Sequence, residues 1–317
     1  MARAYGTRAQ LLGKFRTGGS YGDTPVGDYI KLPFISCDLG GEQGLVASNV
    51  LGHGREPQKP DQDVINVNGN VVVPVDDIHF GYWLRLLLGD PQTAGAAAPY
   101  THTFTSGADA LPDMALEVGM PEVPAFYTNA GVVANSMQLE FVRAGGPQGT
   151  FAVIGQKEVR NPASQGGEPT EAQYRRFSGF LGAVKRNGAA LGNVTRATLT
   201  FANGTEAVEN LRGDGLIDGA DPGAIALSGE IVVRFADTVL EDDASNGTPC
   251  ELELGWVQDA NTSLLFTLHE VYLPKPKKSI SGPGGIQATF AYQGAQNPVG
   301  GKSMTAVLKN AIASYTA

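Results

Sequence analysis

The sequence predicts a mainly β protein composed of two similar halves, and three observations lead to this prediction. Its 317 residues include 42 glycines and 19 prolines, which are spread along the chain and are typical of many turns between short strands. Apolar and polar residues alternate through residues 137–142, which is the period of a half-buried strand. A glycine loop, a β run and a candidate helix follow one another twice, with an offset of about 160 residues.

The first half is predicted to hold one helix among its strands. Asp76 and Asp77 precede the apolar run IHFGYWLRLLL and Gly89 follows it, so we expect a capped helix there. Its apolar residues cover most of its surface, which predicts burial against a sheet. Strands are expected at 30–34, 64–75, 114–118, 132–142 and 150–157.

The second half is predicted to be richer in hairpins. Asn187-Gly188 and Asn203-Gly204 lie between β-type runs, and Asn-Gly is a strong hairpin signal. A short helix is expected near 237–246, and the end, 301–315, suits a strand or a short helix. Strands are expected at 179–184, 194–201, 206–211, 224–235, 250–257, 263–272 and 286–293.

The internal repeat is weak but ordered. NVLGHG at 49–54 aligns with NLRGDG at 210–215, and 67–75 aligns with 227–235, with offsets of 161 and 160. A third echo joins 151–156 to 289–293. The repeat predicts a two-fold duplication. The alternative is a single β-rich domain with similar hairpins.

No catalytic or metal-binding motif is recognised. The sequence contains neither a nucleophile elbow nor a phosphate-binding loop. Asp214, Asp218 and Asp221 lack the spacing of an EF-hand, so we interpret them as a solvated turn. We therefore expect no enzyme activity, no metal and no cofactor. The histidines, which share no metal-ligand spacing, are His53, His79, His102 and His269.

Charge and cysteine content narrow the possible partners. The net charge is -9, whereas nucleic-acid binders carry basic patches, so DNA is either irrelevant or must pass without adhering. Cys37 and Cys250 are expected to be free thiols in a reducing compartment. No signal peptide begins the chain, and the apolar run 83–88 is too short to span a bilayer, so we expect a cytoplasmic protein without membrane contact.

Several segments, taken together and in order, resemble the tail tube (major tail) proteins of flexible-tailed bacteriophages, Mu-like ones included. They span about residues 30–295. The segments are IKLPFISCDLGGEQGLVASNVLGHGREP, FGYWLRLLLGD, GFLGAVKRNGAALGNVTRATLTFANG, LRGDGLIDGADPGAIALSGEIVVRFADT, GTPCELELGW and VYLPKPKKSISGPGGIQATFAYQ.

The resemblance implies a β-sandwich or partial barrel with a flanking helix in each tube domain. It also implies self-assembly into stacked rings around the channel through which genome DNA is ejected, alongside tape-measure, tail tip and terminator proteins. Two domains per chain favour trimeric, pseudo-hexameric rings, whereas one domain favours hexamers. We expect an N-terminal arm at 1–30, domain 1 at 31–160, a linker at 161–175 and domain 2 at 176–317.

The resemblance and the negative charge together predict a carboxylate-lined channel that repels phosphate. Alternating polar positions on the strands are the candidates for channel-lining or interface residues, and simple solvent exposure is the alternative. The candidates are Gln138, Glu140, Thr198, Thr200 and Glu230.

Two questions stay open at this stage. The basic cluster Lys275–Lys278 is either a loop that limits strand pairing or a charged contact with a neighbouring subunit. Other functions to weigh are a tail terminator, a secretion-system tube protein and a β-sandwich carbohydrate-binding module.

Overall fold

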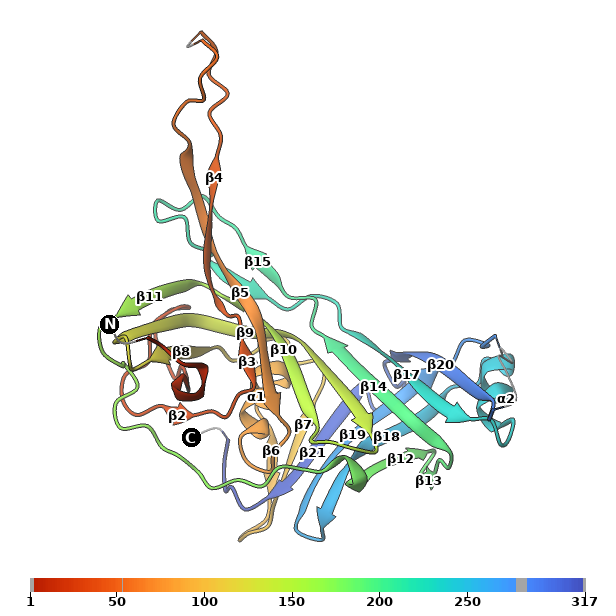
Figure 1. The fold of residues 1–317 in the computed structure, drawn as a ribbon. Helices are drawn as coiled ribbons and strands as arrows, with labels where there is room; N and C mark the ends of the chain where they lie inside the picture. Colours follow the sequence, from red (N-terminus) through yellow and green to blue (C-terminus); the bar gives the residue numbers. More distant parts are fainter. Residues whose placement is uncertain (1–2, 53, 278–283, 316–317) are drawn as a thin grey trace.

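The computed structural model describes residues 3–52, 54–277 and 284–315. Parts of the segments predicted from the sequence lie outside these described residues. They are residues 1–2, His53, 278–283 with Lys278, and 316–317. The fold is mainly β, as predicted, with a long hairpin projecting from one end of a broad sheet (Figure 1).

The first half pairs its strands in a fixed succession. β1 (Gln10–Phe15) lies between β2 (Ile30–Lys31) and β8 (Met114–Met120), and β8 pairs with β9 (Ala125–Val142). β9 also pairs with β10 (Gln148–Gly155) and β11 (Lys157–Asn161). β10 continues to β5 (Asp61–Pro74), whose far edge holds β3 (Ser36–Cys37) and β4 (Gly40–Val46).

The second half repeats that succession. β12 (Gly182–Arg186) lies between β13 (Ala189–Ala190) and β18 (Cys250–Asp259), and β18 pairs with β19 (Thr262–Tyr272). β19 also pairs with β20 (Gln287–Ala295) and β21 (Met304–Asn310). β20 continues to β17 (Ala226–Arg234), whose far edge holds β14 (Val194–Ala202). Each pairing just described for the first half therefore has a counterpart in the second.

The projecting hairpins occupy matching places in the two halves. In the first half, β4 and β5 form the long hairpin, and in the second, β15 (Glu206–Val208) and β16 (Gly219–Asp221) form a short one between β14 and β17. The described residues of the two segments aligned by sequence, 49–52 with 54 and 210–215, lie in these two hairpin loops.

The two halves join at one strand pair and through one strand of the first half that crosses to the second. β9 pairs with β14 from Ser136↔Ala202 to Val142↔Arg196, so the two sheets become one. β7 (Tyr100–Thr105), which pairs with β6 (Gln92–Ala94), crosses to pair with β21 of the second half. Through these two connections, the strands of both halves belong to one sheet.

Helix α1 (Phe80–Leu88) is buried as the sequence predicts. Its N-cap residue, His79, makes no side-chain cap bond, and Asp76 instead bonds the turn that leads into the helix. The Asp76 carboxylate accepts hydrogen bonds from the backbone N–H groups of Ile78 and His79, at 2.8 and 2.5 Å, and Gly89 adopts a φ of 94° at the other end. Trp83 stacks on Phe151 of β10 with ring centroids 5.1 Å apart. The counterpart, α2 (Val239–Asn246), buries only Leu240 and Asp243.

The arm predicted at 1–30 differs from the structure. Leu11, Leu12 and Phe15 are buried on β1, because β8 offers it a full antiparallel edge. The segment at 161–175, predicted as a linker, follows β11 without regular structure, and its Gly166 and Thr170 exchange backbone hydrogen bonds with Tyr29 and Lys31. The chain end, for which strand and helix were both open, forms strand β21.

Candidate functional site

All five residues proposed from the sequence lie on one face of three neighbouring strands. Gln138 of β9 stands opposite Thr200 of β14. Glu140 stands opposite Thr198, which in turn stands opposite Glu230 of β17. The prediction rested on alternation within single strands, and the sheet register brings the side chains together.

The same face extends over six strands as rows of mostly polar side chains. One row runs through the strands of both halves in register: Val72, Thr150, Gln138, Thr200, Ser228 and Gln293. The next row continues from Glu140, Thr198 and Glu230 to Ala291 on β20. These side chains are uncharged apart from the two glutamates, so the face is polar but carries little charge.

Arg196 neutralises the two glutamates, and sequence reasoning missed it. Its guanidinium donates through Nε to Glu140 Oε1 and through Nη1 to Glu230 Oε1, both at 2.6 Å. The bond to Glu140 is the main cause that raises the pKa of Arg196 above its usual value. Its place two residues before Thr198 on β14 was the available signal, since alternate residues share a face.

Carboxylates do not outnumber basic groups on the central strands of this face. On the six strands β5, β10, β9, β14, β17 and β20, the charged residues of the face between the positions aligned with Val72 and Arg234 are Glu140, Glu230, Arg196 and Arg234. Two acidic and two basic residues give a net charge of zero. The charge of -9 therefore resides elsewhere on the chain.

The opposite face of these strands is the core, which holds the polar face in place. Met137, Leu139 and Phe141 of β9 alternate with the polar residues and are buried. Phe141 stacks on Trp256 of β18 with ring centroids 4.4 Å apart. Close packing of this buried face against β18 and α1 thus fixes the orientation of the exposed side chains.

The hairpin β4–β5 carries exposed apolar side chains well beyond the sheet. β5 pairs with β10 only from Val67 onward, so residues 61–66 extend about 20 Å past it at about 3.3 Å per residue. The exposed side chains are Leu45, Val46, Val50, Leu51, Val64 and Ile65.

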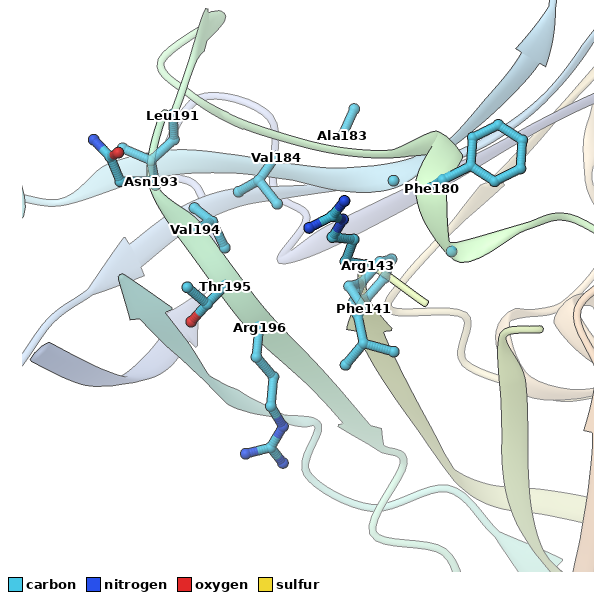
Figure 2. Close-up of a pocket in the computed structure, with 13 residues that line it drawn as sticks. Phe141, Arg143, Phe180, Ala183, Val184, Leu191, Asn193, Val194, Thr195 and Arg196 are labelled. Carbon is cyan, nitrogen blue, oxygen red and sulfur yellow. The ribbon is translucent and has the colours of Figure 1, made fainter. Parts of the chain in front are cut away.

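A groove lies at the other end of the same sheet, where β9 ends and β14 begins. It has a volume of about 280 Å³ and is bounded by η2 (Gly179–Leu181), β12 and the loop that enters β14. Phe180 is 74% exposed beside it. Figure 2 shows Arg143 in the groove near Val184, and Arg196 also lines the groove.

Neither a metal-ligand cluster nor a membrane-crossing helix occurs in the part of the chain that the structure describes. Among the residues described, no group of three or more His, Cys, Asp or Glu side chains is placed to hold a metal ion. Within those same ranges, no helix has the length and apolar character needed to cross a bilayer. His79 and His102 are buried, and His269 contacts Thr305.

Comparison with known proteins agrees with the sheet architecture. None of the curated proteins compared matches this chain. The family model described as "Phage tail tube protein" matches residues 6–294, which is nearly the whole chain and includes both halves. The chain therefore belongs to the phage tail tube protein family, whose members are structural components of the virion tail.

Proposed function

We propose that three copies of this chain close into a pseudo-hexameric ring and that rings stack into a tube through which genome DNA passes. The observation that carries the proposal is the single sheet built from both halves. Each half supplies four strands to it: β3–β4, β5, β10 and β9 from the first, and β14, β17, β20 and β19 from the second. The two halves act as the two tube domains, with residues 161–175 as the connection between them.

One edge of this sheet is available to pair with another chain. Within the chain, the outer edge of β14 is covered by β9. The matching outer edge of β3–β4 pairs with no described strand. An uncovered edge leaves backbone donors and acceptors without partners. Repeating the β9–β14 junction between copies satisfies them and closes a ring.

Barrel size favours three copies. At a strand spacing of about 4.8 Å and a tilt of about 40°, 24 strands (three copies of eight) make a barrel about 48 Å across, with a bore of about 38 Å once side chains are counted. By the same relation, 16 strands leave a bore of only about 22 Å, and 48 strands a backbone diameter of about 96 Å. Three copies admit a hydrated duplex without a wide empty space.

The polar face suits a channel lining. Binding to DNA is driven by cations that neutralise phosphates. On the six strands β5, β10, β9, β14, β17 and β20, this face has equal numbers of acidic and basic groups, and Arg196 is held by two glutamates. DNA facing it therefore meets small hydroxyl, amide and methyl groups and slides. Low net charge, rather than the repulsion predicted from sequence, keeps the channel from adhering.

Stacking is assigned to the β4–β5 hairpin. A two-stranded hairpin is marginal by itself, and this one exposes apolar residues such as Leu51. We place it against the end of the next ring, where the groove beside Phe180 lies. Contact between two different surfaces is heterologous, so the tube grows open-ended until a terminator stops it. A tape-measure protein within the tube and tail tip proteins at one end complete the proposed assembly, which forms in the host cytoplasm.

The carbohydrate-binding alternative loses its basis. Both tryptophans, Trp83 and Trp256, are 1% exposed and pack in the core, so neither offers a platform for a sugar. We propose that the protein acts without catalysis. The projecting hairpin favours a stacking tube subunit over a terminator, which must end a stack.

Electron microscopy of the purified full-length chain tests the ring. We expect stacked rings, each with three copies and an approximate sixfold appearance. Rings of six copies with true sixfold symmetry overturn the trimer, and a chain that remains monomeric at high concentration overturns tube formation.

Phage carrying variants of the polar face test the lining. The double substitution Glu140→Gln and Glu230→Gln leaves the Arg196 cation without its carboxylate partners. We expect intact tails with slower DNA ejection, because the free cation can bind phosphate. Arg196→Gln leaves two carboxylates and should not slow ejection. If both variants eject DNA at the wild-type rate, this face does not line the channel.

A further inference from the structure

We infer the register of the junction between copies: Lys275 of one copy stands opposite Glu42 of the next, with Lys277 diagonal to Glu42 and Asp38. This inference rests on the proposed ring. It states that the segment following β19 in one copy pairs with the β3–β4 edge of the next. It also gives a role to the described part of the basic cluster. The partner is a second copy of this chain.

The first edge is located by the match between β14 and β3–β4. Thr200 stands opposite Ser228 of β17, and Gly40 stands opposite Asn68 of β5. At the other end, Arg196 stands opposite Val232 and Ser36 opposite Val72. Both comparisons give an offset of 160, the one found in the sequence repeat. Residues 36–42 therefore occupy the place of residues 196–202.

The second edge is located by the match between β10 and β20. Thr150 stands opposite Val72 and Thr289 opposite Val232, which gives an offset of 139. Val133 stands opposite Ile154, and Tyr272 opposite Gln293, with the same offset. Residues 134–138 therefore correspond to 273–277, which follow β19 directly.

A bulge decides which side chains face outward. In β9, Ala134 and Ser136 stand opposite successive residues of β10, so Asn135 is an extra residue. Leu273, the counterpart of Ala134, is buried. Without a bulge at Pro274, strict alternation would turn Lys275 and Lys277 into the core, where an unpaired charge is costly. With the bulge, both lysines join the polar face.

The exposure of these residues agrees with the bulge. Lys275 and Lys277 are exposed, and Pro276 between them is partly buried. Pro274 lacks a backbone N–H and so suits a bulge position, where no ladder bond is needed.

The in-chain junction then supplies the pairs. Ser136 stands opposite Ala202, which becomes Lys275 opposite Glu42. Gln138 stands opposite Thr200, which becomes Lys277 opposite Gly40, with Glu42 and Asp38 at the diagonal positions.

The charges give the junction a direction. Glu42, Asp38 and Lys275 are exposed, and within the described ranges none of them forms an ion pair, although the Asp38 carboxylate accepts a hydrogen bond from the backbone N–H of Asn70 in its own sheet. Opposite charges across two strands stabilise the pair and like charges destabilise it. An edge bearing Lys275 and Lys277 therefore accepts the β3–β4 edge of the next copy and disfavours a second edge of its own kind.

Cysteine cross-linking in assembled rings tests the register. Glu42→Cys combined with Lys275→Cys should yield, on mild oxidation, covalent dimers and trimers on a non-reducing gel. Each single variant serves as a control for the native cysteines. Ser136→Cys with Ala202→Cys places the same pair inside one chain, and it should cross-link without any increase in mass.

The outcomes separate the two proposals. Rings that cross-link support the register. Rings that form normally, while only the in-chain pair cross-links, overturn the register and leave the ring standing. Absence of rings in the unmodified protein overturns both.

Charge reversal gives an independent measurement. Glu42→Lys should raise the critical concentration for ring assembly about fivefold or more, because attraction becomes repulsion at each junction. Adding Lys275→Glu should restore assembly. Asp109→Lys, the same charge change at an exposed position in the loop between β7 and β8, which belongs to neither edge strand, should have no effect. Failure of the double variant to recover contradicts the pairing.

Discussion

The packing of Tyr315 against Gly81 of α1 can be tested by the substitution Gly81→Ala. Tyr315 follows the last strand of the second half, yet its side chain is 1% exposed against the helix of the first. A Cβ added at Gly81 would lie 2.2 Å from Tyr315 Cζ. The ring cannot simply turn aside, because Tyr82 and His102 pack against it with centroids 4.9 and 4.7 Å away.

The size of the effect follows from what Tyr315 loses. Its hydroxyl donates to the Ile78 carbonyl and accepts from Asn310 Nδ2, both at 2.7 Å, and Arg85 donates to its carbonyl at 2.8 Å. Loss of a buried aromatic side chain costs about 3–5 kcal/mol. Alanine in place of a helical glycine returns about 1 kcal/mol. Gly81→Ala should therefore lower the free energy of unfolding by about 2–4 kcal/mol.

A double-mutant cycle checks the cause by urea unfolding. Tyr315→Ala should cost about 3–5 kcal/mol alone, and adding Gly81→Ala should cost nothing more and recover about 1 kcal/mol, because the obstacle is gone. Hydrogen exchange should show that residues 311–315 lose protection in Gly81→Ala. Additive effects of the two substitutions, or a neutral Gly81→Ala, would refute the reasoning.

Four further outcomes are expected. Asp76→Ala removes the carboxylate that bonds the turn leading into α1 and should lower the free energy of unfolding by about 1–2 kcal/mol, measured by urea unfolding. Replacing the loop 47–60 with a short turn should leave rings that no longer stack, as seen by electron microscopy; normal tubes would contradict the stacking role. Burial raises the pKa of Cys250 to about 11, so iodoacetamide at pH 8 should modify it only after unfolding, as read by mass spectrometry. The Arg212 hydrogen bond lowers the pKa of Asp214 to about 2, so the stabilisation from this pair is present above the usual value of 3.8 and lost as pH falls through about 2; an NMR midpoint near 3.8 would contradict the bond.

Local pattern predicted most individual elements. The helix at α1 was legible because Asp76 and Gly89 mark its two ends, and both act within one turn of the helix. The strands were legible where one face is buried, as on β9, because a pleated strand sends successive side chains to opposite faces. β1 was missed because its glycine-rich surroundings resemble an exposed arm, while the partner edge of β8 lies about a hundred residues away.

The structure gathers the five candidate residues on one face, and their role as a channel lining stays a proposal. Glu140 and Glu230 were identified by alternation, as were the neighbouring polar positions. Arg196 comes between them only when β9, β14 and β17 lie side by side. Without that register, the net charge of the chain pointed to an acidic lining.

The sequence by itself determined the β-rich character, the helix ends, the absence of a recognisable catalytic motif and the order in which similar segments recur. These features depend on contacts within a few residues. Only the tertiary structure decided that β9 joins β14, that the C-terminal segment crosses to α1, and that the polar face is neutral. Such features depend on which strand edges meet, and the pairing energy of an edge is set by a partner far along the chain or, in the ring proposed above, on another copy.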